Sequence, residues 1–181
     1  CLADDMGLGK TVQVLAHLLR RKQELGETRT CLVVTPRSLC FHWVQEAARF
    51  TPGLSVIEYT GGDRQAKWKR LEQHDIVVTT YGTLRQDAAR LSKIRFDSVV
   101  LDEAQAIKNP TTATTKAARK LEGTHRLVVT GTPVENHLGE LWSLMSFANP
   151  GLLGTQAAFK TRYADYVGTA AGADALEALR K

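Results

Sequence analysis

The 181-residue sequence predicts an α/β domain with a mostly parallel central sheet and helices on both faces. Two observations lead to this prediction: short apolar runs rich in β-branched residues, and segments of helical periodicity between them. The runs are continuous rather than alternating, which is typical of strands buried on both faces of a parallel sheet. Strands that alternate with helices indicate a doubly wound arrangement, in which ligands bind at the carboxyl ends of the strands.

The expected elements alternate along the chain. The expected strands are residues 31–36 (CLVVTP), 54–59 (LSVIEY), 75–80 (DIVVTT), 96–104 (FDSVVLDEA) and 125–133 (HRLVVTGTP). The expected helices are residues 10–25, a stripe through Leu39, Trp43, Ala47 and Phe50, residues 111–122, and residues 141–148. The segment 63–73 is basic with an interleaved tryptophan, and both a solvated helix face and a nucleic-acid-binding stretch remain open for it.

Composition excludes several classes of protein. Apolar residues make up 43% and charged residues 24%, as in globular rather than disordered chains. The net charge of +5 permits an anionic partner without selecting one. Three cysteines without C-x-x-C spacing suggest neither a disulfide framework nor a zinc site. No apolar run approaches the roughly 20 residues of a membrane span, and no signal peptide is present.

The segment DDMGLGKT, residues 4–11, ends like a phosphate-binding loop, although Asp4 stands where the pattern G-x-x-x-x-G-K-[ST] has its first glycine. Glycines let backbone N–H groups close around an anion, Lys10 offers a charge to the terminal phosphates, and the Thr11 hydroxyl can join a Mg²⁺ shell. A glycine-rich turn that caps a helix is the alternative. The predicted nucleotide-binding residues are Asp5, Met6, Gly7, Leu8, Gly9, Lys10 and Thr11.

A second motif follows in the expected order. The run VVLDEAQ, residues 99–105, is an apolar strand that ends in two carboxylates. Asp102 is expected to hold Mg²⁺ through water, and Glu103 to orient or deprotonate an attacking water. A solvated turn is the alternative for this motif alone. The loop and the acidic pair together predict a site for ATP and Mg²⁺, with Lys10, Asp102 and Glu103 as its catalytic residues and Thr11 and Asp102 as metal ligands.

The stretches LADDMGLGKTVQVLAHL, DEAQAIKNP and VVTGTPVENHLGELWSLMSFANPGLLG closely resemble the Swi/Snf-type helicase-like ATPases of helicase superfamily two. The resemblance covers residues 1 to about 165 and implies a P-loop, RecA-like lobe of a duplex-DNA translocase. Aspartate is usual in that family at the position of Asp4, so Asp4 is no defect. The family more often has Glu at the position of Asp5 and His at that of Gln105.

The resemblance also implies roles for residues outside the two motifs. It implies DNA contact by residues 33–39 together with Trp43, and by residues 79–84, through Thr35, Arg37, Ser38, Thr79, Thr80 and Tyr81. Core packing is the alternative for Trp43, and closure of a turn for Tyr81. It implies coupling of nucleotide state to DNA grip by Gln105, Thr130, Gly131 and Thr132. A plain turn, with Pro133 at the start of a helix, is the alternative for that segment.

These observations lead to one expectation for the whole chain. Residues 1–165 form the N-terminal RecA-like ATPase lobe with a truncated first strand, and residues 166–181 form a peripheral helical tail towards a second lobe outside the sequence. The parent protein is expected to be a monomeric DNA-dependent ATPase that moves along duplex DNA and remodels or displaces bound proteins, without contacting a membrane. Because the second lobe would supply the transition-state arginine, the 181-residue fragment itself should bind nucleotide weakly and hydrolyse it poorly.

Location and chemistry leave alternatives. The amino-acid sequence of residues 134–154 favours a bacterial protein of the cytoplasm or nucleoid, while a eukaryotic relative would be nuclear. A strand-separating DNA or RNA helicase is one alternative function. A nucleotide-gated binding module without turnover is another.

Overall fold

The computed structural model describes residues 1–5, 7–25, 29–134 and 138–163. Its centre is a five-stranded sheet of order β2-β3-β1-β4-β5, in which every pairing between these strands is parallel. The strands are β1 (Cys31–Thr35), β2 (Val56–Tyr59), β3 (Ile76–Thr80), β4 (Arg95–Leu101) and β5 (Glu122–Val128). The predicted fold class is confirmed, and the carboxyl ends of the strands lie at one edge of the sheet.

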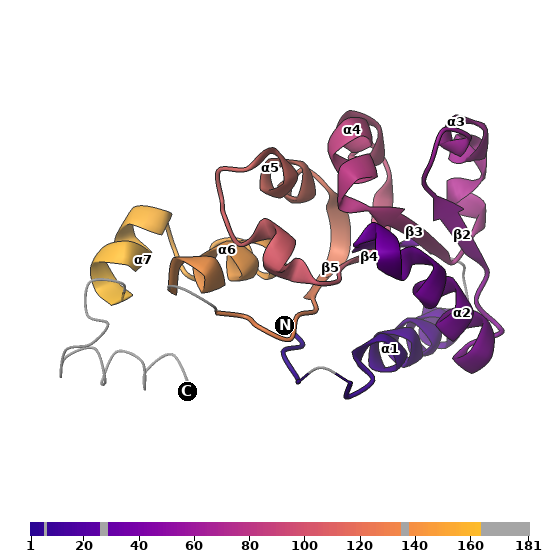
Figure 1. The fold of residues 1–181 in the computed structure, drawn as a ribbon, viewed down its shortest axis with the longest axis horizontal. Coiled ribbons are helices and arrows are strands. Elements are labelled where there is room, and N and C mark those ends of the chain that lie inside the picture. The colour runs from indigo at the N-terminus through magenta and orange to yellow at the C-terminus, as the bar shows by residue number, and fades with distance from the viewer. Residues whose placement is uncertain (6, 26–28, 135–137, 164–181) are drawn as a thin grey trace.

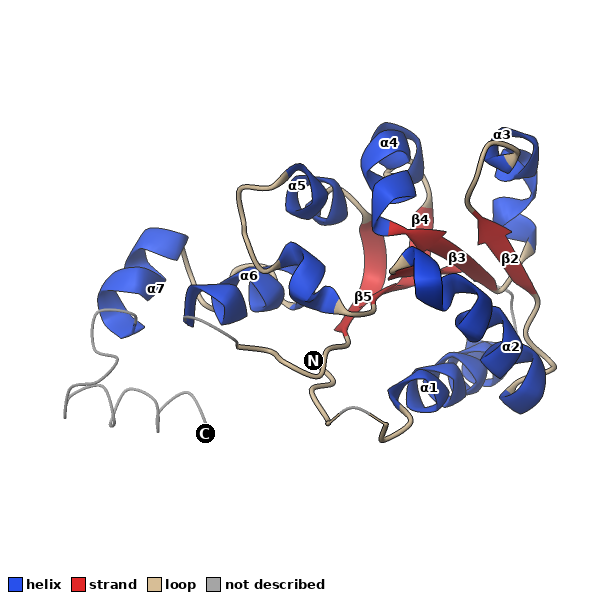
Figure 2. Cartoon of the chain, viewed as in Figure 1, coloured by secondary structure: helices blue, strands red, loops and turns tan. Residues whose placement is uncertain are grey.

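Helices cover both faces of this sheet. Figures 1 and 2 show α1 and α2 on one face, α4 and α5 on the other, and α6 and α7 beyond β5. The helices are α1 (Lys10–Leu25), α2 (Cys40–Phe50), α3 (Arg64–Lys67), α4 (Tyr81–Leu91), α5 (Ala113–Arg119), α6 (Leu138–Ala148) and α7 (Gln156–Tyr163). None of these described helices is long and apolar enough to cross a membrane. The predicted tail, residues 166–181, lies outside the described residues.

Two apolar cores form, one on each face of the sheet. Successive strand residues point to opposite faces, so Leu32 and Val34 of β1 pack under α4, α5 and α6, whereas Val33 packs under α1 and α2. Trp43 lies in the second core and is 1% exposed. Burial on both sides explains the continuous apolar runs, and the core alternative for Trp43 is confirmed.

Two helices were not expected, and a third is shorter than expected. The α4 helix begins where the Thr80 hydroxyl accepts a hydrogen bond from the Thr83 backbone N–H, at 3.0 Å. The α5 helix begins after Thr112, which caps it in the same way, so it covers only part of the predicted span 111–122. A threonine cap in a loop is a short signal, and α4 and α7 carry no long apolar stripe that would announce them.

The β5 strand begins three residues before its predicted start. It pairs with β4 from Glu122 onwards, and the pairing is close, because a Cβ on Gly123 would lie 2.8 Å from a methyl carbon of Val99. Beyond β5, an isolated parallel bridge joins Leu2 to Val129. The chain that leads into the loop before α1 therefore runs beside the end of β5, on the side away from β4.

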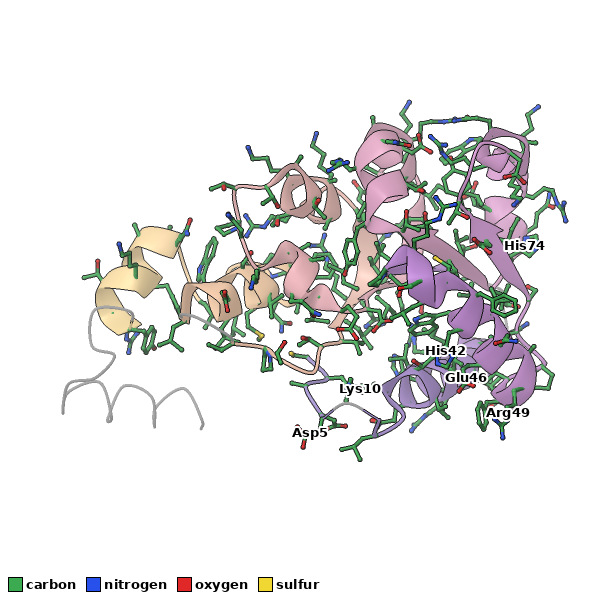
Figure 3. The ribbon with its side chains drawn as sticks, in the orientation of Figure 1. Asp5, Lys10, His42, Glu46, Arg49 and His74 are labelled. Atoms are coloured by element: carbon green, nitrogen blue, oxygen red, sulfur yellow. The ribbon has the colours of Figure 1, made fainter. Side chains whose placement is uncertain are left out.

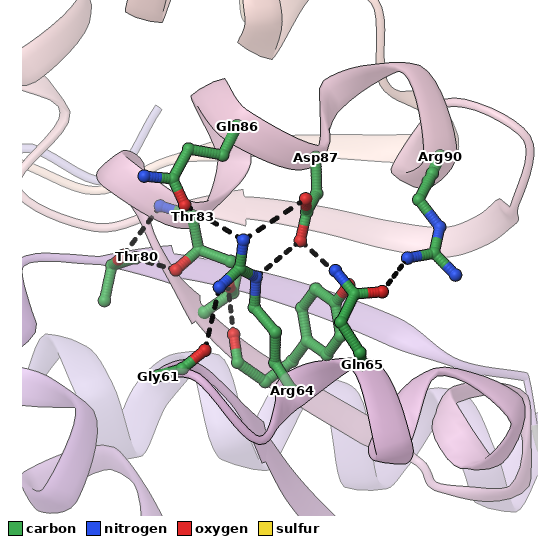
Figure 4. A network of polar contacts seen from close by, with 10 residues as sticks. Gly61, Arg64, Gln65, Thr80, Thr83, Gln86, Asp87 and Arg90 are labelled. Carbon is green, nitrogen blue, oxygen red and sulfur yellow. Dashed lines mark hydrogen bonds and ion pairs between the residues drawn. The ribbon is translucent and has the colours of Figure 1, made fainter.

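The basic segment 63–73 is mostly exposed, in keeping with its interpretation as a solvated helix face. It forms the single turn of α3 and a 3₁₀ turn, η2 (Trp68–Gln73). The Arg64 guanidinium donates to Asp87 of α4 at 2.7 Å, and the Tyr59 hydroxyl donates to the same carboxylate oxygen at 2.9 Å. Figure 4 shows this network, which ties α3 to α4 at a residue where α4 departs from helical geometry.

Candidate nucleotide site

The loop before α1 has the backbone of an anion cradle. Gly7 and Gly9 have φ values of +85° and +72°, in the left-handed region that side chains other than glycine adopt at a cost. A Cβ at either position would meet nothing within 4 Å, so the space beside the backbone is open to a ligand. The α1 helix begins at Lys10 and directs its free N–H groups at the same place. Met6, also predicted here, lies outside the described residues.

The Lys10 ammonium is held by main-chain oxygens of its own loop. Its Nζ donates to the backbone carbonyls of Asp4 and Asp5, both at 2.8 Å. The Asp4 side chain instead accepts a long hydrogen bond from Gln13, at 3.4 Å. Because residue 4 contributes only its carbonyl to Lys10, this contact makes no demand for glycine there.

Asp102 follows β4 and is 7% exposed. Its Oδ2 accepts from Trp43 Nε1 at 2.8 Å and from Thr35 Oγ1 at 2.9 Å, and its Oδ1 accepts from the Glu103 backbone N–H at 3.0 Å. The Tyr81 hydroxyl donates to the main-chain oxygen of Asp102 at 2.7 Å. Donors from β1, α2 and α4 therefore fix this one residue.

Asp102 differs from the other buried acids in its partners. Asp75, Asp87 and Asp97 form ion pairs with Lys22, Arg64 and Arg21, and Glu140 lies 3.5 Å from Lys108. Among the residues that the structure describes, no such cationic partner of Asp102 is found, and its side chain is held by neutral donors. A buried carboxylate without a cation is costly unless a ligand brings the positive charge.

The donor set around Asp102 fits a magnesium ion held through water. A carboxylate has about four lone-pair sites, and three of them already accept protein hydrogen bonds, two on Oδ2 and one on Oδ1. The remaining capacity is on Oδ1. Mg²⁺ keeps several of its waters in proteins, so an outer-shell role matches a carboxylate that is this fully engaged.

Glu103 is joined to the end of β5 by a polar chain. Its carboxylate accepts from Gln105 Nε2 at 2.7 Å, and Gln105 Oε1 accepts from the Thr130 hydroxyl at 3.2 Å. Glu103 is also the non-glycine residue with positive φ, +48°, in the described chain, a conformation that concentrates at functional sites. Thr130 thus reaches Glu103 through the Gln105 amide. Among the other predicted coupling residues, the Thr132 backbone N–H donates to Thr130, and Gly131 lies between them.

A cavity of about 290 Å³ brings the two motifs together. Its lining residues from the predicted set are Gly7, Gly9, Lys10, Thr11, Asp102 and Glu103. Leu39, His42 and Glu46 also line it, and none of these was predicted. Figure 3 labels His42 and Glu46 on α2, Lys10 at the start of α1 and Asp5 on the loop before it. Leu39, His42 and Glu46 are three and four residues apart, a spacing that places side chains on one helix face, and this spacing is the sequence signal that could have identified them.

The six predicted DNA-contact residues fall into three pairs that differ in exposure and in hydrogen-bond partners. Arg37 and Ser38 are exposed on the 3₁₀ turn η1 (Arg37–Leu39) that precedes α2. Thr35 and Thr79 are 0% exposed, and their hydroxyls bond to Asp102 and to the Tyr59 carbonyl. In this conformation, these two side chains cannot reach a phosphate. Thr80 caps α4 and Tyr81 bonds to Asp102, so the hydroxyls at these positions have internal partners.

Comparison with known proteins adds three findings. The family described as SNF2-related domain matches residues 1–181. A putative ATP-dependent helicase/translocase of Bacillus subtilis, YwqA, is 42% identical over 90% of this chain, which spans 18% of that protein. The TATA-binding protein-associated factor MOT1 of Saccharomyces cerevisiae is 38% identical over 99% of this chain, which spans 11% of that protein. The chain is thus much shorter than these relatives.

A solved structure gives the same picture. The SWI2/SNF2 ATPase core of Sulfolobus solfataricus, in complex with double-stranded DNA, superposes with a TM-score of 0.88 at 40% identity. The superposition covers 99% of this chain and 38% of the Sulfolobus chain. The structure of that ATPase core domain alone gives a TM-score of 0.81 at 39% identity.

Proposed function

Because this chain belongs to the SNF2-related domain family, we propose that it is the first ATP-binding lobe of an enzyme that hydrolyses ATP to move along duplex DNA. The observation that carries the proposal is the cavity in which Lys10 and Thr11 face Asp102 and Glu103. The likeness to a core solved with double-stranded DNA supports the choice of DNA as the track. Remodelling or displacement of DNA-bound proteins is the proposed outcome of that movement.

In this mechanism, the loop and Lys10 bind the phosphates. The Lys10 ammonium exchanges its two carbonyl acceptors for phosphate oxygens, while the backbone of Gly7 and Gly9 and the start of α1 receive the anion. Thr11 and Asp102 would hold Mg²⁺, which neutralises charge on the phosphate oxygens when it is bound. Glu103 orients the attacking water, and its own carboxylate is oriented by Gln105.

A second RecA-like lobe completes this proposal. The chain spans 38% of the Sulfolobus ATPase core, so a comparable enzyme has room for a further lobe that contributes a transition-state arginine. We therefore expect the 181-residue chain alone to bind nucleotide weakly and to turn over slowly. Brisk DNA-dependent hydrolysis by the chain alone would contradict this part of the proposal.

The first test compares nucleic acids as activators. ATP hydrolysis by the full-length protein is measured without nucleic acid and with single-stranded DNA, duplex DNA or RNA. We expect strong stimulation by duplex DNA. Stimulation mainly by single strands or RNA would instead indicate a strand-separating helicase.

A variant separates catalysis from binding in the same assay. Glu103→Gln keeps the size of the side chain and removes the carboxylate that orients water. We expect it to bind nucleotide and to lose hydrolysis. Equal rates for this variant and the wild type would indicate a binding module without productive turnover.

A further inference from the structure

The two segments proposed to meet DNA both reach Asp102. From the first segment, Trp43 and Thr35 donate to its carboxylate at 2.8 and 2.9 Å. From the second, the Tyr81 hydroxyl donates to its main-chain oxygen at 2.7 Å. The same residue that faces the nucleotide cavity is therefore bonded to both places where the track is expected to bind.

These contacts are short and have fixed direction. An indole N–H can only donate, so Trp43 always presents a donor to Oδ2. A phenol is protonated near neutral pH, so the Tyr81 hydroxyl is available as the donor to the main-chain oxygen of Asp102. Hydrogen bonds to a carboxylate are stronger than those between neutral groups.

Each donor is also rigidly attached to a surface that can meet DNA. Trp43 is 1% exposed and lies in the first turn of α2, which follows the turn that carries the exposed Arg37 and Ser38. Trp43 is five positions after Ser38, a rise of about 8 Å if the turn is taken as helical. Tyr81 is the first residue of α4, next to the Thr80 cap. A small displacement of either helix start must move a donor at Asp102.

We propose that Trp43 and Tyr81 are positioning residues that transmit DNA contact at the starts of α2 and α4 to Asp102. The proposal rests on the proposed function, because it takes duplex DNA as the ligand of these two segments. It assigns the transmission to hydrogen bonds at Asp102, in addition to the chain from Glu103 through Gln105 to Thr130.

The chain offers matched controls for both residues. Tyr81→Phe removes one hydroxyl that bonds to Asp102, and Tyr59→Phe removes one that bonds to Asp87, which does not line the cavity. Trp43→Phe removes an indole N–H bonded to Asp102, and Trp142→Phe removes one bonded to the Gly154 carbonyl. Each pair makes the same chemical change, at and away from the proposed path.

The experiment measures coupling in the full-length protein. The dissociation constant for a fluorescent DNA duplex is determined with and without a non-hydrolysable ATP analogue and Mg²⁺, and hydrolysis is measured with and without DNA. For Tyr81→Phe and Trp43→Phe, we expect the stimulation by DNA to fall at least about fivefold, and the effect of the analogue on DNA affinity to shrink equally. For Trp43→Phe, whose side chain is buried, DNA affinity without nucleotide should change less than about twofold. The controls should behave like the wild type.

The possible outcomes separate this inference from the function on which it rests. If the wild type couples nucleotide to DNA and both variants keep that coupling, the inference is wrong and the proposed function stands. If Trp43→Phe loses DNA affinity without nucleotide, or the controls lose coupling equally, the effect is structural and the inference is also wrong. If the wild type does not bind duplex DNA, the proposed function fails together with the inference.

A second measurement uses NMR spectroscopy to follow the Trp43 hydrogen bond to Asp102 without ATP turnover. The three tryptophans are Trp43, Trp68 and Trp142, and each indole N–H gives its own signal in a ¹H–¹⁵N spectrum of the 181-residue chain. We expect duplex DNA without nucleotide to shift the Trp43 signal and to leave that of Trp142 in place. A Trp43 signal that stays fixed while DNA is bound would contradict the inference.

Discussion

Asp102 and Asp87 are two buried aspartates of the same fold, with exposed fractions of 7% each, and their partners differ. A tyrosine hydroxyl donates to each residue: Tyr81 to the main-chain oxygen of Asp102, and Tyr59 to the carboxylate of Asp87. Asp87 has the guanidinium of Arg64 at 2.7 Å, whereas the described partners of Asp102 are neutral. The charge of Asp87 is therefore neutralised within the protein, whereas the surroundings of Asp102 are those of a site that binds a cation.

The pKa of Asp87 reflects this completeness. Burial alone would raise it, but hydrogen bonds from Arg64 and Tyr59 outweigh burial, so the pKa is lowered. The pKa values of Asp75 and Asp97 are lowered in the same way, against the effect of burial. The comparison teaches that this fold neutralises its structural acids with its own cations and leaves the acid at the nucleotide cavity to neutral donors.

The largest expected effect tests the functional side of the comparison. In Asp102→Asn, we expect ATP hydrolysis by the full-length protein to fall by about a thousandfold, roughly 4 kcal/mol of transition-state stabilisation, because the charge proposed to support Mg²⁺ is lost. The free energy of unfolding should stay within about 1 kcal/mol of the wild type, since no protein cation is left unpaired. Steady-state kinetics and urea unfolding check both values. A stability loss as large as that of an ion-pair variant would break the comparison.

The matched substitution tests the structural side. In Asp87→Asn, we expect the free energy of unfolding to fall by about 2 kcal/mol, because the Arg64 charge loses its partner in a mostly buried place. Hydrolysis should stay within about threefold of the wild type. Urea unfolding of both variants under identical conditions gives the measurement. Hydrolysis that falls as steeply as in Asp102→Asn would show that the two carboxylates are not separate in function.

A smaller effect is expected at Glu103, which is held by an amide rather than by a cation. In Gln105→Ala, the hydrogen bonds to Glu103 and from Thr130 are lost. We expect turnover to fall by about tenfold, which corresponds to roughly one hydrogen bond, while nucleotide affinity changes less than about twofold. Fluorescent-nucleotide binding measured beside turnover makes the distinction. A change in affinity without a change in turnover would remove Gln105 from the coupling chain.

The smallest effect concerns acid pH. For Asp75, Asp87 and Asp97 the folded-state pKa lies below the unfolded value of about 3.9, so their stabilisation is complete above that pH and is lost as the pH falls through the folded-state values. We therefore expect the free energy of unfolding to be insensitive to these groups near neutral pH and to decline below about pH 4. Asp87→Asn should decline less steeply than the wild type. Parallel acid titrations of unfolding for the two proteins provide the check.

The sheet could be predicted from the sequence because its central strands are buried on both faces. The runs at residues 31–36 and 75–80 coincide with β1 and β3, whose residues are buried throughout. The edge strand β5 was placed too late, because its partly exposed residues lack that apolar signature. The α4 helix was missed because its start depends on a threonine cap, and because its kink at Asp87 is held by Arg64, which lies outside the helix.

Only those parts of the site that lie in short continuous motifs could be predicted from the sequence. Lys10, Thr11, Asp102 and Glu103 belong to compact motifs, and the cavity brings them together. The roles assigned to the DNA-contact residues stay predictions, and the burial of Thr35 and Thr79 limits them in this conformation. Trp43 was expected in the core and is there, but its bond to Asp102 was not foreseen. Its sequence position gave one hint, since a buried indole N–H needs an acceptor.

The isolated bridge at Leu2 contains two backbone amides whose hydrogen bonds depend on the relative position of the nucleotide loop and the segment after β5. The Leu2 N–H donates to the Val128 carbonyl at 2.8 Å, and the Thr130 N–H donates to the Leu2 carbonyl at 3.1 Å. Because a single residue makes both hydrogen bonds, any movement of one strand end against the other must lengthen at least one of them. The rates of hydrogen–deuterium exchange at these two amides, compared between nucleotide states, would therefore measure this movement.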